Sequence, residues 1–273
     1  MTPEQAQAAA VKTLRAAGFD DAPREVRLLW GAAFPRRYVD YDQLSDGTAL
    51  SRFQDLVQRR LTHEPISHLL GYRDFYKHRF TVSAAVLDPR PDTETLVEQA
   101  LELPFATVLD LGTGSGCILL SLLADRPEAQ GTGTDLSAAA LDVARQNIAR
   151  LELDAQAQLL QSDGFENVTG RFDLIVSNPP YIAADEMDDL QSELRLHEPR
   201  IALTDEADGL TCYRHIIAHA PDYLTPQGAL MVEIGLTQGA AVSQMMSERG
   251  FAQVAISQDL DGRDRVVCGI WPH

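Results

Sequence analysis

The residues with the clearest chemical potential are four consecutive ones, Asn178-Pro179-Pro180-Tyr181, which follow an apolar segment expected to be a buried strand. Two prolines after a strand stop its hydrogen-bond ladder and restrict the backbone, so the neighbouring groups are rigidly held. The Asn178 side-chain oxygen and the Pro179 carbonyl could each accept one N–H of an amide or aromatic amino group. Tyr181 could pack on that planar group and hold it in line. The tetrad therefore predicts chemistry at a poorly nucleophilic nitrogen, with a rigid structural turn as the alternative.

A glycine loop lies where an expected strand, residues 107–111, runs into Gly112-Thr113-Gly114-Ser115-Gly116 and then into a helix. Glycines at a strand-to-helix turn let the backbone approach a ligand that side chains would exclude. Cys117 stands where the dinucleotide fingerprint would need a glycine. Asp135 ends the next expected strand, where a carboxylate can accept hydrogen bonds from both hydroxyls of a ribose. Loop and acid together predict a nucleoside cofactor, and the alternative for Asp135 is a surface acid at a strand end.

A third group, Asp163-Gly164-Phe165, follows the expected strand at residues 157–160. By this position, Asp163 could reach the amino group of an adenine, and Phe165 could pack on its ring. Phe165 is equally well explained as a core aromatic, so both interpretations stay open.

The elements that must position these motifs alternate between strands and helices. Expected strands cover residues 107–111, 131–134, 157–160, 172–176, 229–234, 254–256 and 266–270. Expected helices cover residues 117–124, 137–150 (with Ser137 as N-cap) and 239–248. This order predicts an α/β fold with a mainly parallel sheet and helices on both faces. Ligands bind such sheets at the carboxyl ends of central strands, where the tetrad and the loop lie.

The first seventy or so residues are predicted to be helical. Helices are expected over residues 4–17, from Pro23 to Gly31, from an N-cap at Ser51, and from Pro65 to Gly71. Residues 72–90 are rich in aromatic and β-branched side chains, which favours a β-hairpin or linker. We therefore predict a helical domain at 1–71, a hairpin linker at 72–90 and an α/β domain at 91–273.

The composition is that of an ordinary globular protein. The 273 residues are 45% hydrophobic and 23% charged. The longest apolar runs are far shorter than the roughly 20 residues of a membrane span, and the start lacks the features of a secretory signal. Three cysteines lie far apart, which argues against a disulfide framework or a thiolate metal site and fits a reducing cytoplasm.

The net charge of −17 is unevenly divided, with +2 on residues 1–90 and −19 on residues 91–273. A strongly acidic half would repel a phosphate backbone, which needs Lys and Arg to displace its counterions. It would attract a basic macromolecule, or serve solubility alone.

Taken together, the motifs resemble the HemK (PrmC) family of protein-(glutamine-N5) methyltransferases over nearly the whole chain. Pro89-Arg90-Pro91-Asp92-Thr93-Glu94 is similar to the family's interdomain signature. The loop at residues 110–116 resembles its cofactor loop, and the tetrad resembles its substrate site. Glu198-Pro199-Arg200-Ile201-Ala202-Leu203, Asp208-Gly209-Leu210 and Glu233-Ile234-Gly235 are similar to later family segments.

The resemblance implies a Rossmann-like class I S-adenosylmethionine-dependent methyltransferase domain, with a mainly parallel seven-stranded sheet, and a small N-terminal helical domain that helps dock the substrate. The implied reaction methylates the N5 amide of the Gly-Gly-Gln glutamine in class 1 peptide chain release factors, by a monomeric cytoplasmic enzyme without a metal. S-adenosylmethionine would contact Asp110, Gly112, Thr113, Gly114, Ser115, Gly116, Asp135, Asp163, Gly164, Phe165 and Asn178. Asn178, Pro179, Pro180 and Tyr181 would bind the glutamine, with Asn178, Pro179 and Tyr181 in the catalytic roles.

Two positions depart from the family pattern. Asp88 stands where relatives usually carry an apolar residue, and Gly164 stands where many relatives have tryptophan or another large residue near the adenine. The second departure puts a side-chain contact at that point in doubt, although Phe165 could compensate.

Three alternative functions remain open. A sister enzyme that methylates a glutamine of a ribosomal protein shares the loop and tetrad, but the Arg90–Glu94 signature argues against it. A DNA adenine methyltransferase would share the tetrad chemistry, but acidic side chains around the site oppose phosphate binding: Asp185, Glu186, Asp188, Asp189, Glu193 and Glu198. A non-catalytic S-adenosylmethionine-binding scaffold is disfavoured by the intact tetrad.

Two further sets of reactive side chains carry little weight. His215 and His219 share a helix face without a third metal ligand, so ordinary surface or core histidines are expected. Cys117 is expected to be a small residue at a helix start rather than a nucleophile.

Overall fold

The computed structural model describes residues 2–34 and 47–273, and the chain divides into two compact units. The first unit contains Met1–Tyr72 together with a short later segment, Gln191–His197. The second contains Arg73–Leu190 and Glu198–His273. The second unit carries the tetrad and the glycine loop, so it is the one that holds the candidate site.

The first unit is built from helices α1 (Pro3–Ala16), α2 (Ala22–Ala33), α3 (Gly47–Leu61) and α4 (Ile66–Leu70). Helix α3 begins before Ser51, so the prediction that Ser51 is an N-cap was wrong. Helix α2 continues past Gly31, because a glycine costs only about 1 kcal/mol within a helix and Ala33 beyond it is buried in the core. Helix α4 does end at Gly71, whose φ of 77° requires a residue without a β-carbon penalty.

Helix α8 (Ser192–His197) belongs to this helical unit although it follows the tetrad in the chain. Arg60, only 5% exposed, donates through Nη1 to Glu193 at 2.9 Å and through Nε and Nη2 to Glu25, both at 2.9 Å. The His197 ring lies 2.7 Å from the Thr62 carbonyl oxygen. The sequence did not predict this insertion, which ties the polypeptide between Leu190 and Glu198 to α3.

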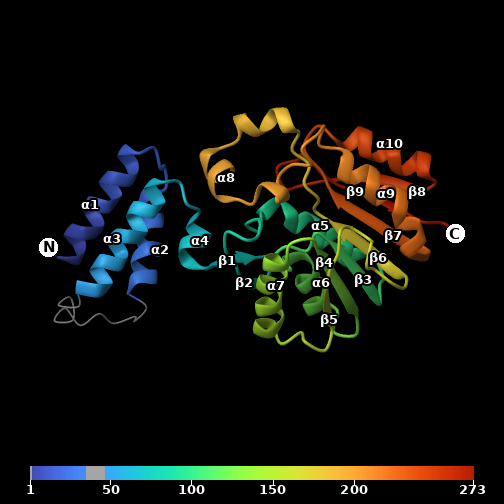
Figure 1. The fold of residues 1–273 in the computed structure, drawn as a ribbon, viewed down its shortest axis with the longest axis horizontal. Helices are drawn as coiled ribbons and strands as arrows, with labels where there is room; N and C mark the ends of the chain where they lie inside the picture. The colour runs from blue at the N-terminus through green and yellow to red at the C-terminus, as the bar shows by residue number, and fades with distance from the viewer. Residues whose placement is uncertain (1, 35–46) are drawn as a thin grey trace. The chain divides into compact units, whose positions relative to one another are not determined.

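The second unit contains a seven-stranded sheet of order β5-β4-β3-β6-β7-β9-β8 (Figure 1). Its strands are β3 (Thr107–Leu111), β4 (Gln130–Asp135), β5 (Ala157–Gln161), β6 (Phe172–Ser177), β7 (Leu224–Glu233), β8 (Ala252–Gln258) and β9 (Asp264–Ile270). Strands β5, β4, β3, β6 and β7 pair in parallel, and β9 runs antiparallel to both β7 and β8. The predicted mainly parallel seven-stranded sheet is confirmed.

Helices cover both faces of this sheet because its central strands are apolar on both sides. Val108 of β3 packs in a core with α5 (Glu94–Glu102), α6 (Cys117–Asp125) and α7 (Ala138–Leu151). Leu109, the next residue, packs in the opposite core with α9 (Thr211–Tyr223) and α10 (Gly239–Arg249). Ser137 caps α7 by accepting from Ala140 N at 3.2 Å, as predicted.

Shorter elements complete the second unit. Strands β1 (Tyr72–Phe75) and β2 (His78–Thr81) form a two-stranded sheet, in agreement with the expected hairpin. Three 3₁₀ helices, η2 (Pro91–Thr93), η3 (Ala184–Asp189) and η4 (Arg200–Ala202), lie within or beside the signature segments. Within the two described stretches, no helix is both long and apolar enough to span a membrane.

Arg60 is expected to contribute much more stability to the helical unit than its neighbour Arg59. Replacing Arg60 with alanine leaves Glu25 without its buried partner, which typically costs about 3 kcal/mol of unfolding free energy. Arg59→Ala removes a bidentate pair with Glu64 whose arginine is 46% exposed, and should cost less than about 1 kcal/mol. Hydrogen exchange of the backbone amides in α2 and α3 under native conditions measures the loss of stability in each variant. Equal protection in the two variants would contradict the larger contribution expected of Arg60.

Candidate active site

The register of the central strands brings the three predicted motifs to one edge of the sheet. Leu111, the last residue of β3, pairs with Thr134 of β4 and with Ser177 of β6. The glycine loop, Asp135 and Asn178 therefore follow directly from neighbouring carboxyl ends. The Ser177 hydroxyl donates to the Leu111 carbonyl at 2.7 Å, which adds a side-chain bond to this junction.

The glycine loop has the backbone shape that only glycine adopts without strain. Gly112, Gly114 and Gly116 have φ values of 70°, 56° and 81°. A β-carbon built on Gly112 or Gly114 would meet no atom within 4 Å, so the backbone there borders open space. Gly116 N–H donates to the Thr113 carbonyl at 2.8 Å and closes the turn before α6. The backbone of this loop therefore borders open space, which is what the close approach of a cofactor would require.

Asp135 holds the loop and keeps acceptor capacity for a ligand. Its Oδ2 accepts from Gly114 N–H at 2.9 Å and its Oδ1 from Ser137 N–H at 2.8 Å. Each carboxylate oxygen has two lone pairs, so a second hydrogen bond on each is available. The half-buried Asp135 therefore fits the role of an acceptor for two ribose hydroxyls.

Asp110 lies fully buried within β3, directly before the loop. Its Oδ2 accepts from the Thr113 hydroxyl at 2.7 Å, while Oδ1 has no hydrogen-bond partner. Desolvation by burial raises the pKa of this carboxyl to about 7, against the lowering effect of Thr113. Asp110 is thus suited to holding the loop from beneath.

Asn147 of α7 is a supporting residue that the sequence analysis missed. It is fully buried, and its Nδ2 donates to the Ser115 carbonyl at 2.8 Å and to the Thr81 carbonyl at 3.0 Å. Its Oδ1 accepts from Thr81 N–H at 2.6 Å. The side chain thereby joins the cofactor loop to β2, a contact between segments too distant in sequence for a local pattern to reveal.

The region after β5 agrees only in part with its expected role. Asp163 is exposed at the same edge of the sheet, two strands away from β3. Phe165 is only 3% exposed and stacks on Tyr223, with ring centroids 4.6 Å apart. The phenyl ring therefore belongs to the core, which was the alternative interpretation of its sequence position.

The space beside Gly164 is taken by a histidine from α9. A β-carbon built on Gly164 would lie 3.1 Å from His215 Nε2, and the φ of 50° already disfavours other residues there. His215 and His219 lie with ring centroids 4.4 Å apart. An imidazole thus borders the position where the family resemblance led us to expect a large side chain from the loop itself.

The first residue of the tetrad, Asn178, is half-buried and oriented by a threonine. Its Nδ2 donates to Thr93 Oγ1 at 3.3 Å. Because that end of the amide is engaged, Oδ1 is the end left to accept a hydrogen bond from a ligand. Pro179 beside it is buried, and as a proline it has a carbonyl acceptor but no N–H donor.

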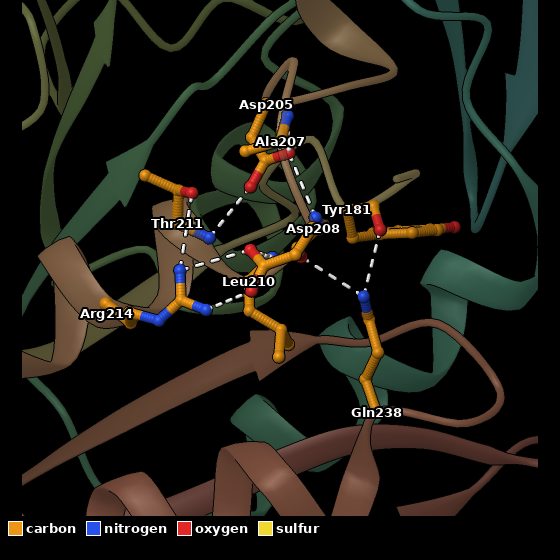
Figure 2. Close-up of polar contacts among 9 residues, drawn as sticks. Tyr181, Asp205, Ala207, Asp208, Leu210, Thr211, Arg214 and Gln238 are labelled. Atoms are coloured by element: carbon orange, nitrogen blue, oxygen red, sulfur yellow. Dashed lines mark hydrogen bonds and ion pairs between the residues drawn. The ribbon is translucent and has the colours of Figure 1, made fainter. Parts of the chain in front are cut away.

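The backbone at Tyr181 is fixed by Gln238, as Figure 2 shows. The Gln238 Nε2 donates to the Tyr181 carbonyl at 2.9 Å and to the Gly209 carbonyl at 3.1 Å. Its Oε1 accepts from Gly235 N–H at 2.9 Å. A β-carbon on Gly209 would lie 2.4 Å from the Tyr181 oxygen, so only glycine permits this approach. One amide side chain thus connects the tetrad with two of the family-like segments.

The loop before α9 has its own hydrogen-bond network in Figure 2. The Asp205 carboxylate accepts from the backbone N–H groups of Ala207, Gly209 and Thr211 at 2.8–3.0 Å. These bonds lower the pKa of Asp205, against the raising effect of burial. Arg214 of α9 pairs with Asp208 in the same loop. The result is a rigid turn that places Gly209 against the tetrad.

The Tyr181 side chain lies next to a buried cluster of charge. Burial raises the pKa of its hydroxyl, with Glu233 adding to the effect and Arg265 opposing it. Glu233 ends β7 and is fully buried, and desolvation raises its pKa to about 7 although Thr93, Arg265 and Tyr181 act to lower it. Arg265 Nη2 lies 3.3 Å from the Asp92 carboxylate and 3.1 Å from that of Asp259.

The segment around Pro89–Glu94 and the segment that begins at Glu198 are joined by a hydrogen bond. Asp88 N–H donates to the carboxylate of Glu198, which is 7% exposed, at 3.2 Å. The Asp88 carboxylate lies 3.5 Å from Arg73, so this departure from the family pattern places a buried acid beside a cation. Glu94 accepts from Tyr76 N–H at 2.9 Å. Glu198 is therefore no part of an open acidic surface, contrary to its inclusion among the acids expected to repel phosphate.

The Cys117 side chain is a buried thiol at the start of α6. Burial raises the pKa of the Cys117 thiol to about 12, so the group is a neutral thiol at physiological pH. Among the described residues, no group of three or more His, Cys, Asp or Glu side chains could hold a metal ion.

Comparison with known proteins identifies the family. Residues 77–208 match the model of the methyltransferase small domain, and residues 5–71 match the model of the PrmC N-terminal domain. The release factor glutamine methyltransferase of Cereibacter sphaeroides is 49% identical, with 97% of this chain and 96% of that protein covered. The chain belongs to the release factor glutamine methyltransferase family. The enzyme of the same name from Caulobacter vibrioides is 40% identical over 99% of this chain and 96% of its own length.

The fold has structural relatives as well. A methyltransferase from Pyrococcus furiosus superposes with a TM-score of 0.55 at 16% identity, covering 82% of this chain and all of that one. This likeness confirms the expected methyltransferase fold, while the curated relatives and the family models confirm the expected family and S-adenosylmethionine as the methyl donor. The assignment of individual site residues stays a prediction that the geometry above makes specific.

Asp135→Ala is expected to weaken S-adenosylmethionine binding by at least about 100-fold, since two charge-assisted hydrogen bonds are each worth about 1.5–3 kcal/mol. Isothermal titration calorimetry measures this loss directly. Asp142→Ala, which removes an exposed carboxylate of α7 paired with Arg145, serves as the matched control and should change the Kd by less than about twofold. Equal affinities of the two variants would exclude Asp135 from the cofactor site.

Asp110 should make the protein less stable as the pH rises. Its pKa is about 7 in the folded state and 3.8 in the reference state, so the folded protein holds an extra proton between these values. The free energy of unfolding should therefore fall as the pH rises from about 4 to 7, by on the order of 4 kcal/mol from this group. Urea unfolding at several pH values should show wild type losing stability relative to Asp110→Asn over this window. A constant difference between the two would refute the raised pKa.

Proposed function

We propose that this chain transfers a methyl group from S-adenosylmethionine to the side-chain amide nitrogen of the glutamine in the Gly-Gly-Gln motif of class 1 release factors. The observation that carries the proposal is the arrangement of Asn178 at the carboxyl end of β6. Its Nδ2 donates to Thr93, which leaves Oδ1 free to accept a hydrogen bond from the substrate. The neighbouring Pro179 carbonyl supplies a second acceptor. The names of the relatives from Cereibacter and Caulobacter support the same substrate.

Two acceptors suit the chemistry of an amide nitrogen. The lone pair of that nitrogen is delocalised into the carbonyl, so the group is a poor nucleophile. Hydrogen bonds from both N–H groups to Asn178 Oδ1 and the Pro179 oxygen orient the nitrogen and favour tetrahedral geometry as the bond forms. When bound, S-adenosylmethionine supplies a methyl group on a positively charged sulfur. The site needs no strong base, because the N–H proton becomes acidic only as the nitrogen is methylated, and then passes from the amide to water.

The cofactor would lie across the carboxyl ends of β3 and β4. We assign Gly112–Gly116 to the close backbone approach, Asp135 to the ribose hydroxyls and Asp163 to the adenine amino group. Asp110 supports the loop from below through Thr113. His215, rather than the buried Phe165, is the aromatic ring at the surface next to Gly164.

The surface after the tetrad favours a protein substrate over a nucleic acid. Helix η3 carries Asp185, Glu186, Asp188 and Asp189, all exposed. Acidic side chains at this point oppose a phosphate backbone and attract basic segments. Glu193 does not add to this surface in the same way, because it pairs with Arg60 in the helical unit. We also expect a monomer that acts in the cytoplasm, where the three free cysteines would stay reduced.

A methyl-transfer assay tests the substrate. Enzyme and labelled S-adenosylmethionine are offered an unmodified class 1 release factor, the same factor with its Gly-Gly-Gln glutamine changed to alanine, ribosomal proteins and DNA. Label in the unmodified factor alone is expected. Label in a ribosomal protein would assign the sister activity, label in DNA would assign adenine methylation, and no label anywhere would support a non-catalytic role.

Asn178→Ala is expected to lower kcat by at least about 100-fold, on the scale of losing one preorganised polar group of an active site. The Kd for S-adenosylmethionine should change much less, since the glycine loop and Asp135 remain. Single-turnover methylation and calorimetry of the same preparation separate these two effects. Turnover near the wild-type rate would refute the assignment of Asn178 as an amide acceptor.

A further inference from the structure

The orientation of the Asn178 amide needs a physical cause. An asparagine side chain can rotate to exchange its oxygen and its NH₂ group, which have similar shape but opposite hydrogen-bonding character. With the NH₂ group toward the substrate, two sets of N–H donors would face each other and the amide would be repelled. Only the orientation with Oδ1 toward the substrate is productive, so a neighbouring group must select it.

Thr93 has the geometry to make this selection. It lies in η2, within the Pro89–Glu94 signature, and its side chain is 2% exposed. Its Oγ1 accepts from Asn178 Nδ2 at 3.3 Å across 85 residues of sequence. A hydroxyl has one proton, so Thr93 acts as a dependable acceptor for Asn178 when that proton is donated elsewhere.

Glu233 is placed to take the Thr93 proton. Its carboxyl group is fully buried at the end of β7, and its Oε2 has no hydrogen-bond partner. The Thr93 and Tyr181 hydroxyl groups lie near enough to act to lower the pKa of this carboxyl. An ionised carboxylate is an acceptor only, so it forces the Thr93 hydroxyl to donate toward it. A protonated Glu233 could instead donate to Thr93, which would release Asn178 from its orientation.

The charged groups that face Glu233 come from several elements. Arg265 of β9 stabilises the carboxylate, and Asp92 of η2 opposes it. Burial raises the pKa of the Tyr181 and Tyr213 hydroxyl groups above the usual value. The negative charge of Glu233 raises both pKa values further. Cys117, whose thiol is neutral, also lies within range of this charge. Arg265 stays protonated near neutral pH, so Glu233 is the group whose charge changes there among the groups just named.

We propose that Thr93 and Glu233 are positioning residues for glutamine methylation: Glu233 accepts the Thr93 hydroxyl proton, Thr93 accepts from Asn178 Nδ2, and Asn178 Oδ1 is thereby turned to the substrate amide. The inference rests on the proposed function, because it concerns the orientation of the same acceptor. In this proposal Thr93 acts through the hydrogen bonds of its hydroxyl group and not through packing alone.

Paired variants of Thr93 separate hydrogen bonding from packing. Thr93→Val keeps the shape but removes the hydroxyl, and should lower kcat by about 10-fold or more. Thr93→Ser keeps the hydroxyl and should stay within about threefold of wild type. Thr95→Val changes a buried threonine two residues further along, in α5, and should stay within about twofold. Thermal melting confirms that each variant is folded, and the KM for the release factor should change less than kcat.

The pH dependence of kcat tests the role of Glu233. Its pKa of about 7 predicts that wild-type kcat falls as the pH is lowered through about 7, since protonation removes the constraint on Thr93. Glu233→Gln cannot titrate, so this inflection should disappear. Saturating S-adenosylmethionine is used throughout, so that titration of Asp110 beneath the cofactor loop does not enter kcat through cofactor binding.

Each outcome has one meaning. A folded Thr93→Val enzyme with wild-type kcat, or an unchanged inflection in Glu233→Gln, would overturn the proposal. If Thr93→Val does not fold, the Glu233→Gln profile alone decides. Wild-type enzyme that fails to label the release factor would refute the proposed function instead, and the same variants would then be measured with whichever substrate is labelled.

Discussion

The parallel pairing of β3 with β4 on one side and with β6 on the other is the constraint on which the rest of the site depends. Because Leu111 pairs with both Thr134 and Ser177, the loops after β4 and β6 each begin one strand spacing from the glycine loop after β3. Adjacent strands lie about 4.8 Å apart, so the strand register alone brings the start of the Gly112 loop and Asn178 close together. A shift of register in either pair would separate the methyl donor from the acceptor, whatever the side chains.

Two buried carboxyl groups at this end of the sheet are destabilising in their charged form. Asp110 and Glu233 are both fully buried at the carboxyl end of the sheet, and burial raises the pKa of each to about 7. Apolar residues of similar size would pack there at lower cost. Asp110 instead accepts from the Thr113 hydroxyl of the glycine loop, and Glu233 is the group that we propose takes the proton of the Thr93 hydroxyl. Perturbed carboxyl groups of this kind concentrate at functional sites, which is consistent with roles beyond stability.

The sequence predicted the structure best at positions where the local backbone conformation restricts which residue type can stand there. The glycines of the loop, the prolines of the tetrad and the alternation of strands and helices predicted the sheet, the edge and the motifs. Contacts between distant segments left no such local pattern. Thr93 and Asn178 are 85 residues apart, and helix α8 packs with α3 through Arg60 and Glu193, 133 residues apart. Phe165 could not be decided either, since its packing on Tyr223 is set by the placement of α9.

The Pro89–Glu94 segment supports the tetrad through contacts that the four residues themselves do not specify. An Asn-Pro-Pro-Tyr segment offers the same two acceptors to any planar amino group, but the residues that support it differ in what they allow. Here three consecutive residues contact three different parts of the unit. Asp92 pairs with Arg265, and Thr93 accepts from Asn178. Glu94 accepts from the backbone N–H of Tyr76. Asp88, just before them, is bonded to Glu198 beyond the tetrad. The polypeptide entering the α/β unit and the polypeptide leaving the tetrad are thus joined on both sides of the acceptor. We expect such a support to limit how a nitrogen approaches Asn178, which would make selectivity a property of these surrounding segments as well as of the four residues themselves.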